Sequence, residues 1–341
     1  MKSKSPRSRA TGRVTLADVA ALAKVSPITV SRALRGERAV ASDLTERVKA
    51  AADKLGYTPD PAARALASRH SDHVAVLIPM LSNNLFVDVL ESIQKTLRQA
   101  GYQTLIGITH YDTREEEQLL REQLQHRPAG ILVTGLDRSD AARTLIEKSG
   151  IPCVHMMELA QSPEVNSVGF SQTQAAIALT KHLLQRGRQR IAFAAAQLDP
   201  RTMQRLDGWR KALKAAKRYD KALTYTNKSA SSMALGGQML AEILKNDPEV
   251  DAIFFCNDDL AQGALLAAQR LKIKVPQQLA IVGFNDLTGS DLIGPGLTTI
   301  RTPRAEIGQA AAHMLLALMR EEDVPTPSVD VGYELMVRGS T

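Results

Sequence analysis

A short stretch near the start of the chain gathers side chains that can form hydrogen bonds with a polyanion. Residues 15–34 contain four hydroxyl groups and one arginine: Thr15, Ser26, Thr29, Ser31 and Arg32. Hydroxyl groups suit single bonds to phosphate oxygens, which position a protein without reading base sequence. A guanidinium group can donate two parallel bonds to O6 and N7 of guanine. This chemistry suits nucleic-acid recognition, provided that the residues share one surface.

Two short helices joined by a tight turn are predicted to carry these side chains. Thr15 and Asp18 have the spacing of a capping box, and an apolar stripe follows at helical intervals: Leu16, Val19, Ala20 and Ala23. Ser26 is a good N-cap and Pro27 suits a first helical position, so the second helix is expected from about Pro27 to Leu34.

A third helix is predicted to begin at Ser42 and to end before Gly56, which suits the C′ position. Its apolar stripe consists of Leu44, Val48, Ala51, Ala52 and Leu55. Three such helices can share one small core, so residues 14–58 are expected to form an all-α domain. The spacing fits either a generic three-helix cluster or a DNA-binding helix-turn-helix, and the short turn favours the second.

The distribution of charge also favours a nucleic-acid partner. Residues 1–70 contain 14 lysines and arginines against 6 aspartates and glutamates, a net charge of +8, whereas the whole chain has +7. The other 271 residues therefore have a net charge of −1. Basic residues confined to one end predict a polyanion partner for that end, bound with an affinity that depends on salt.

Four motifs in this region resemble the signature of the LacI family of bacterial repressors. They are Thr15-Leu-x-Asp-Val-Ala, Val25-Ser-x-x-Thr29-Val-Ser-Arg32, Leu55-Gly-Tyr-x-Pro59 and Ala63-Arg-x-Leu66. The resemblance implies a homodimer that binds a near-palindromic double-stranded DNA operator. It places Pro27, Ile28 and Arg32 on the helix face that meets base edges, where Ile28 can pack against a thymine methyl group. Two plainer alternatives stay open: Ser26 as a simple helix cap and Arg32 as a solvated surface residue.

Residues 59–71 are interpreted as a linker with a conditional helix. Asp60 and Pro61 suit a helix start, but the alanine-rich run after them is too short to form a stable helix alone in water. In the resembled family this hinge folds on DNA and its leucine wedges into the minor groove, a position that Leu66 matches. A simple alanine-rich tether is the alternative, because the family usually has Asn at position 60 and rarely has Pro at 61.

Several classes of protein are disfavoured by what the sequence lacks. Residues 1–13 have no apolar run of signal-peptide length and are expected to form a disordered basic arm of a cytoplasmic protein. No stretch approaches the about 18 apolar residues of a membrane span. Cys153 and Cys256 are expected to be reduced core thiols. The seven histidines lack metal-ligand spacing and no nucleophile or phosphate-loop motif is present, so no enzyme, metal or other cofactor is expected.

From residue 72 onward, short apolar runs alternate with helical stretches. The runs are 74–78, 103–106, 130–133, 153–155, 191–194, 252–255 and 279–282, and helices are expected at 86–100, 114–125, 172–186, 203–216, 236–245 and 260–271. Such alternation predicts doubly wound parallel sheets, and this length favours two α/β lobes over one. The resemblance implies the same: a core like that of periplasmic sugar-binding proteins, with a ligand cleft between lobes.

The resembled core has three chain crossings between its lobes. We expect them near Val168, Arg301-Thr302 and Val329. Within the core at 72–341, lobe one then comprises about 72–167 and 303–328, and lobe two comprises about 168–302 and 329–341.

Residues that follow predicted strands are the candidates for ligand binding, because ligands of open α/β sheets bind beyond the carboxyl ends of the strands. In the first lobe they are Asn83, Asn84, Phe86, Thr134 and Glu158. In the second lobe, segments similar to the family contain Arg205, Trp209, Asn257, Asp258 and Asn285. The resemblance makes Arg205 the first choice as anchor. Helix capping by Asn257 and Asp258, and a turn at 283–286, are the alternatives.

A sugar acid is the predicted ligand. A guanidinium group pairs well with a carboxylate, and Asn285 stands where the resembled family usually has an acidic residue, which removes one competing anion. The stretches at 78–93, 101–104 and 168–170 look like the branch of the family that senses gluconate and related acids. We therefore expect 2-ketogluconate first and gluconate next, with a neutral sugar or a nucleobase as alternatives.

Ligand binding is expected to change the angle between the lobes. This angle would determine whether the two helix-turn-helix domains of a dimer can bind adjacent operator half-sites at the same time. No heptad-patterned tail follows the last crossing, so we expect a dimer. The sequence does not indicate whether the ligand releases or strengthens DNA binding. A solute-binding receptor and an enzyme are the distant alternatives.

Overall fold

The computed structural model describes residues 14–34, 40–58, 71–82 and 84–341. The chain divides into two compact units, 1–70 and 71–341, each considered by itself. The expected basic arm and most of the expected linker, including Leu66, lie outside the described residues, as does Asn83.

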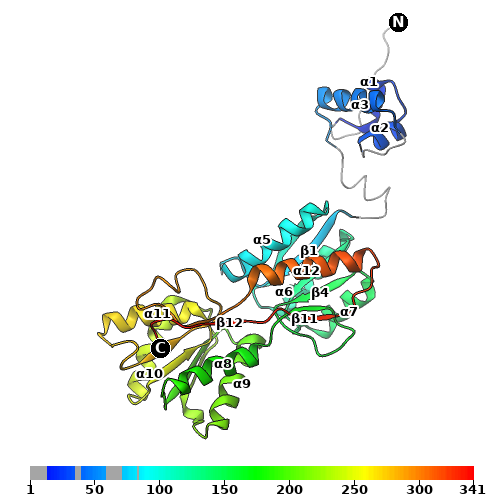
Figure 1. Cartoon of the computed structure of the whole chain (residues 1–341). Coiled ribbons are helices and arrows are strands. Elements are labelled where there is room, and N and C mark those ends of the chain that lie inside the picture. The colour runs from blue at the N-terminus through cyan, green and yellow to red at the C-terminus, as the bar shows by residue number, and fades with distance from the viewer. Residues whose placement is uncertain (1–13, 35–39, 59–70, 83) are drawn as a thin grey trace. The chain divides into compact units, whose positions relative to one another are not determined.

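Three helices form the smaller unit: α1 (Leu16–Ala23), α2 (Pro27–Leu34) and α3 (Ser42–Leu55) (Figure 1). They enclose a core of their own, in which one valine from each helix is fully buried: Val19, Val30 and Val48. The predicted capping box is present, because Thr15 and Asp18 bond to each other's backbone N–H groups. Gly56 ends α3 at a positive φ of 63°, as predicted.

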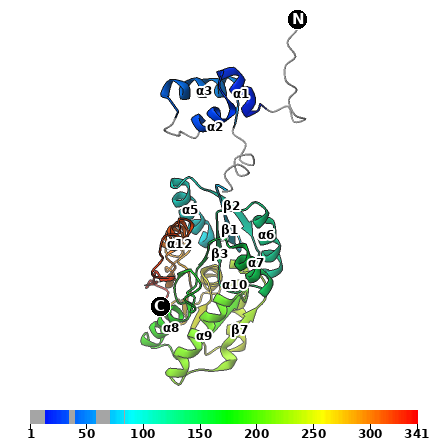
Figure 2. The same cartoon turned by 90° about the vertical axis from the view of Figure 1, so that its right-hand side faces the viewer.

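The first lobe of the larger unit has a six-stranded, wholly parallel sheet with the order β11-β5-β4-β3-β1-β2. Its strands are β1 (His73–Ile78), β2 (Gln103–Ile108), β3 (Gly130–Thr134), β4 (Cys153–Met156), β5 (Ser167–Gly169) and β11 (Ser328–Asp330). Figure 2 shows α5 (Asn84–Gln99) and α12 (Arg304–Met319) on one face of this sheet, and α6 (Thr113–Gln125) and α7 (Asp140–Ser149) on the other.

The second lobe has a four-stranded parallel sheet with the order β7-β6-β8-β9. Its strands are β6 (Ile191–Ala196), β7 (Thr224–Asn227), β8 (Ala252–Phe255) and β9 (Ala280–Val282), with a short 3-10 helix, η1 (Lys221–Leu223), before β7. Two pairs of helices pack together: α8 (Gln172–Gln185) with α9 (Pro200–Ala215), and α10 (Met233–Asn246) with α11 (Asp258–Arg270). The predicted two-lobed α/β architecture is therefore present.

Two short antiparallel strands, β10 (Thr299–Arg301) and β12 (Glu334–Met336), form a separate pair where the chain passes between the lobes (Figure 1). The end of β10 coincides with the crossing expected at Arg301-Thr302. The other two crossings were expected near Val168 and Val329. These two residues face each other in the first lobe's own sheet, and the chain leaves that sheet after Gly169 and Asp330.

Candidate functional site

One side of helix α2 packs into the core of the smaller unit, and another side is exposed at the surface. Val30 and Ala33 are 0% and 1% exposed, whereas Ile28 is 66% exposed. Pro27 and Arg32 are exposed as well. The three residues predicted to meet base edges therefore lie on the outward side of α2, where an exposed isoleucine offers an apolar contact to a base methyl group.

Two of the four hydroxyl groups predicted to contact phosphate, those of Thr15 and Ser26, also serve as helix caps. Thr15 Oγ1 donates to Asp18 Oδ2 at 2.7 Å. Ser26 Oγ accepts from the backbone N–H of Thr29 at 3.1 Å and lies 2.8 Å from Thr29 Oγ1, while Ser31 is half-buried. Ser26 therefore caps α2, and it does so at the positive end of the helix dipole, where an anion is favoured.

The larger unit encloses a cavity of about 230 Å³ to which both lobes contribute. From the first lobe come Met80, Ser82, Leu85, Phe86 and Tyr111; from the second come Ala196, Gln197, Asp199, Arg201, Thr202, Arg205, Ala230, Ser231, Ser232, Met233, Asn257, Asp259 and Asn285. Pockets for drug-sized ligands measure about 300–1,000 Å³. A cavity below that range, lined by this many polar groups, suits a small and hydrophilic molecule.

Arg205 is one of two buried cations in this cavity, together with Arg201. It is 5% exposed and its guanidinium lies 3.9 Å from the centre of the Phe284 ring. Its N–H groups donate to Gln172 Oε1 (2.9 Å), to the carbonyl of Cys256 (2.6 Å) and to Asn285 Oδ1 (3.5 Å). All three acceptors are neutral, and within the described part of the chain no carboxylate forms an ion pair with Arg205. Burial accordingly lowers the pKa of Arg205.

Arg201, one helical turn before Arg205, is instead surrounded by carboxylates. It lies 3.3 Å from Glu158 Oε2, 3.3 Å from Asp199 Oδ1 and 4.0 Å from Asp137 Oδ1. Although burial opposes the charge, these anions raise the pKa of Arg201 above its ordinary value. The guanidinium also lies 5.7 Å from the ring centre of Tyr111, whose pKa burial raises to about 12. The positive charge of Arg201 is therefore balanced by neighbouring carboxylates, whereas the charge of Arg205 is not.

Two adjacent aspartates at the start of α11, Asp258 and Asp259, have different environments. Asp258 is fully buried and accepts bonds from Thr299 Oγ1 (2.7 Å), Leu287 N (2.7 Å) and Ser290 Oγ (3.1 Å), while burial raises its pKa to about 6. Asp259 is half-buried and lines the cavity. Adjacent residues of a helix point in different directions, so only the second of this pair is available to a ligand.

Four of the expected ligand residues meet in the cavity: Phe86, Arg205, Asn257 and Asn285. Asn257 also caps α11, because its Oδ1 accepts from Leu260 N at 3.2 Å. The ligand and capping interpretations of this residue are thus compatible.

The other expected residues lie outside the cavity lining, for identifiable reasons. Trp209 is fully buried between Phe193 and Tyr219, and Asp258 is held by the three bonds above. Thr134 donates to the carbonyl of Leu77. Asn84 and Glu158 reach across the lobes instead: Asn84 Nδ2 donates to Thr288 Oγ1 at 3.3 Å, and Glu158 meets Arg201 and Gln204.

Several lining residues were not anticipated from the sequence, above all Tyr111, Asp199, Arg201 and Asp259. One signal was present. Asp199 precedes Pro200 and caps α9, so the first turn of α9 begins at the cavity and places Arg201 on the same side as Arg205, four residues later. Tyr111 follows β2 by three residues, but its loop conformation, with a φ of 60°, had no evident sequence signal.

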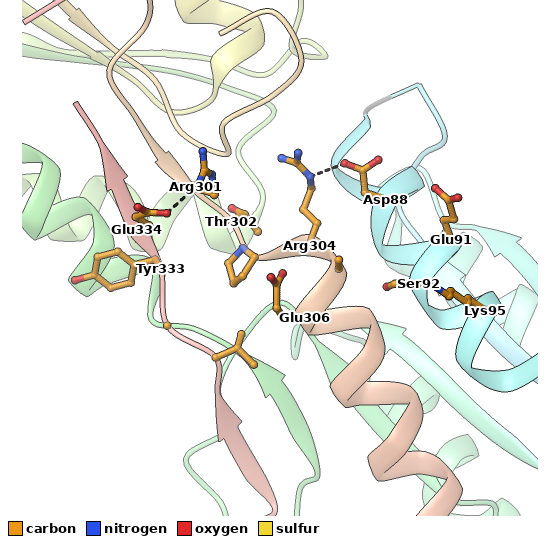
Figure 3. Close-up of a pocket in the computed structure, with 14 residues that line it drawn as sticks. Asp88, Glu91, Ser92, Lys95, Arg301, Thr302, Arg304, Glu306, Tyr333 and Glu334 are labelled. Atoms are coloured by element: carbon orange, nitrogen blue, oxygen red, sulfur yellow. Dashed lines mark hydrogen bonds and ion pairs between the residues drawn. The ribbon is translucent and has the colours of Figure 1, made fainter. Parts of the chain in front are cut away.

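A second, wider cavity of about 720 Å³ lies beside the segments that cross between the lobes (Figure 3). Arg304 at the start of α12 donates to Asp88 Oδ2 of α5 at 2.7 Å, and Arg301 donates to Glu334 at 2.9 Å. Arg304 also donates to the carbonyls of Asn285 (2.8 Å) and Asp286 (3.1 Å) in the second lobe. Asn285 therefore contributes its side chain to the smaller cavity while its backbone is held by Arg304.

The described residues contain no group of three or more His, Cys, Asp or Glu arranged to hold a metal ion. None of the helices in the same residues is both long and apolar enough to cross a membrane. Cys153 and Cys256 are free thiols, and burial raises their pKa values to about 12 and about 11.

Two family models match the chain. Residues 15–60 match the bacterial regulatory proteins of the lacI family, and residues 180–341 match a periplasmic binding protein-like domain. The two matches correspond to the helical unit and to the greater part of the two-lobed unit.

Individual relatives match over nearly their whole length. The HTH-type transcriptional regulator GntR of Pseudomonas aeruginosa is 53% identical over 334 residues, which cover 98% of this chain and 97% of that protein. The crystal structure of the transcription regulator GntR from Chromobacterium violaceum has 48% identity and a TM-score of 0.77, covering 79% of this chain and 98% of that one. A lac repressor dimer bound to operator and the anti-inducer ONPF has 26% identity and a TM-score of 0.85, covering 96% and 99%.

Proposed function

Since the chain belongs to the LacI family of bacterial regulatory proteins and is a DNA-binding transcriptional repressor, we propose that a sugar acid bound between its two lobes controls its affinity for operator DNA. The ligand is placed in the cavity of about 230 Å³, with its carboxylate against Arg205.

The single observation that carries this proposal is the contrast between the two arginines of α9. Arg201 is neutralised by neighbouring carboxylates, whereas Arg205 is buried among neutral acceptors. A buried cation without an anion is costly, and a ligand carboxylate would compensate it with charge-assisted bonds from the remaining guanidinium N–H groups. A neutral sugar would leave that cost in place.

The choice among sugar acids rests on the resemblance to the gluconate-sensing branch of the family. We place 2-ketogluconate first and gluconate second. Both have a carboxylate for Arg205 and hydroxyl groups for the amide of Asn257 and the other polar side chains of the lining. A 5-keto isomer has the same two features and serves as a comparison.

The proposed control acts through the angle between the lobes. A ligand that binds one lobe arrangement more tightly shifts the population toward it by no more than that difference in affinity. In a homodimer, this shift would alter the spacing of the two helix-turn-helix units and hence their fit to a near-palindromic operator. In these units Pro27, Ile28 and Arg32 would face bases, and Thr15, Ser26, Thr29 and Ser31 would face phosphates, with Leu66 at the minor groove.

Calorimetric titration of the full chain tests the proposal. We expect one of 2-ketogluconate, gluconate or 5-ketogluconate to bind and glucose not to bind. Arg205→Ala should lower the affinity for that acid at least about tenfold, equivalent to about 1.4 kcal/mol of binding free energy. Arg210→Ala is the matched control, because Arg210 is an exposed residue of the same helix that pairs with Asp207. Binding of glucose or ribose, or of no acid, would exclude a sugar-acid ligand and leave the family assignment unchanged.

A further inference from the structure

The smaller cavity contains a second charged group whose partner is missing. Of its two lining aspartates, Asp199 is fully engaged: Oδ1 lies 3.3 Å from the Arg201 guanidinium, and Oδ2 accepts from Thr202 Oγ1 at 2.9 Å. Asp259 has no hydrogen-bond or ion-pair partner among the described residues, and burial raises its pKa. An acceptor with two carboxylate oxygens is therefore available to a ligand at this point of the lining.

The cavity has both hydrogen-bond donors and a hydrogen-bond acceptor that are free to contact a ligand. Arg205 has unused N–H donors, as above. Asn257 uses its Oδ1 to accept from Leu260 N and from Ser231 Oγ (3.0 Å), so the group it has left for a ligand is its amide N–H₂ donor. Asp259 is the acceptor that balances them. A ligand that satisfies all three has one anionic end and several hydroxyl groups that can donate.

We propose that Asp259 is a specificity-determining residue, which makes the cavity select polyhydroxy monocarboxylates and reject dicarboxylates of the same chain length. This inference rests on the proposed function, because it takes Arg205 as the site of the first carboxylate. Asp259 then accepts hydrogen bonds from the hydroxyl groups of the ligand and repels a second carboxylate.

The size of the cavity makes this repulsion effective. Because the space measures only about 230 Å³, a second carboxylate at the far end of a six-carbon acid shares it with the Asp259 side chain. Two anions in a partly buried cavity repel each other more strongly than in bulk water, because the effective dielectric constant is lower there. Discrimination of this kind depends on an unfavourable contact with the wrong ligand as much as on a favourable contact with the right one.

Gluconate and glucarate provide the test, because they differ only in the group at C6, a primary alcohol in the first and a carboxylate in the second. Both acids are titrated calorimetrically into the full-length wild-type chain, the Asp259→Asn variant and the Glu242→Gln variant. Asparagine retains the shape of aspartate and one acceptor oxygen but loses the charge. Glu242 is an exposed residue of α10 outside the cavity, so its variant controls for the change in net charge.

We expect the wild-type chain to bind gluconate at least tenfold more tightly than glucarate. Asp259→Asn should raise the affinity for glucarate at least tenfold and so reduce the preference for gluconate. Glu242→Gln should retain the wild-type preference. The inference is overturned if the wild-type chain binds both acids equally, or if its preference persists in Asp259→Asn. A wild-type chain that binds none of gluconate, glucarate, 2-ketogluconate and 5-ketogluconate would instead refute the proposed function, which distinguishes the two failures.

Discussion

Arg201 Nη1 of the second lobe lies 3.3 Å from Glu158 Oε2 of the first, and the two side chains are only 6% and 5% exposed. Gln204 Nε2, on the same helix as Arg201, donates to the other oxygen of Glu158 at 2.5 Å. The lobes are thus held together beside the cavity by a charged contact that is nearly shielded from water. A change in the lobe angle must break or lengthen it.

Glu158→Gln should loosen this contact. The variant leaves Arg201 with Asp199 but removes the negative charge that joins the lobes, and hydrogen bonds to charged groups contribute about 1.5–3 kcal/mol. We expect a lower free energy of unfolding, measured by urea denaturation, and a larger radius of gyration of the ligand-free chain by X-ray scattering. Glu164→Gln, an exposed position before β5, is the control. Unchanged stability and scattering would show that the contact contributes little to lobe closure.

Arg304→Gln should weaken ligand binding although Arg304 lies outside the ligand cavity. It removes the donors to the carbonyls of Asn285 and Asp286, which hold Asn285 at a φ of 113°, a conformation unusual for a residue other than glycine. Losing one or two such bonds predicts about three- to tenfold weaker acid binding by calorimetry.

Asp88→Asn separates the two roles of Arg304. It removes the ion pair between α12 and α5 but leaves the bonds to the two carbonyls in place, so its effect on ligand affinity should be smaller. An equal effect of the two variants would indicate that the ion pair, and not the backbone of Asn285, determines the affinity.

Arg32→Ala should reduce discrimination between operator and random DNA. A bidentate contact with guanine contributes about 1–3 kcal/mol of discrimination, whereas phosphate contacts act on all sequences alike. Anisotropy measurements on an operator selected from a random library with the wild-type chain would show this loss. Lys49→Ala, an exposed change on α3 with the same loss of charge, should retain the ratio of the two affinities. Equal losses on both DNAs in Arg32→Ala would place Arg32 at a phosphate.

The stability of the larger unit should decrease as the pH falls from about 6.5 to about 4, in part because of His155. Burial and the Arg138 cation, which donates to His155 Nδ1 at 2.7 Å and also binds Glu116, lower the pKa of this histidine to about 4. Over that interval the unfolded chain binds a proton at this position and the folded chain does not, so acid favours unfolding.

The contribution of His155 should reach up to about 3 kcal/mol at the acid end of the interval. His155→Gln retains an acceptor for Arg138 but cannot titrate, so the difference in unfolding free energy between wild type and variant should change between about pH 6.5 and pH 4 and be constant above it. His126→Gln, an exposed change at the end of α6, should follow the wild type. Parallel curves for His155→Gln and wild type would contradict the assignment.

Much of the architecture was predictable because it depends on local patterns. Helix caps at Thr15 and Ser26, the glycine end of α3 and the buried run of β1 depend on residues close in the chain, and the structure confirms them. The apolar run at 103–106 lies in β2 at the edge of the sheet, where none of its four residues is buried. β7 was missed because its sequence, Thr-Tyr-Thr-Asn, lies at the edge of the sheet and lacks an apolar run. The ends of β5 and β11, at Gly169 and Asp330, depend on the pairing of these two strands, which joins segments 161 positions apart.

By itself, the sequence determined the three-helix unit and the alternation of strand and helix, because motif spacing and hydrophobic period carry that information. The choice of Arg205 as anchor came from the resemblance to the family. Only the tertiary structure decided which charges are compensated. Arg201 and Arg205 are both arginines of α9, one helical turn apart. Glu158 of the other lobe forms an ion pair with Arg201 but not with Arg205. Asp258 and Asp259 are adjacent, yet only Asp259 lines the cavity. Compensation depends on helix phase and on contacts across the lobes, and neither can be derived from spacing along the chain.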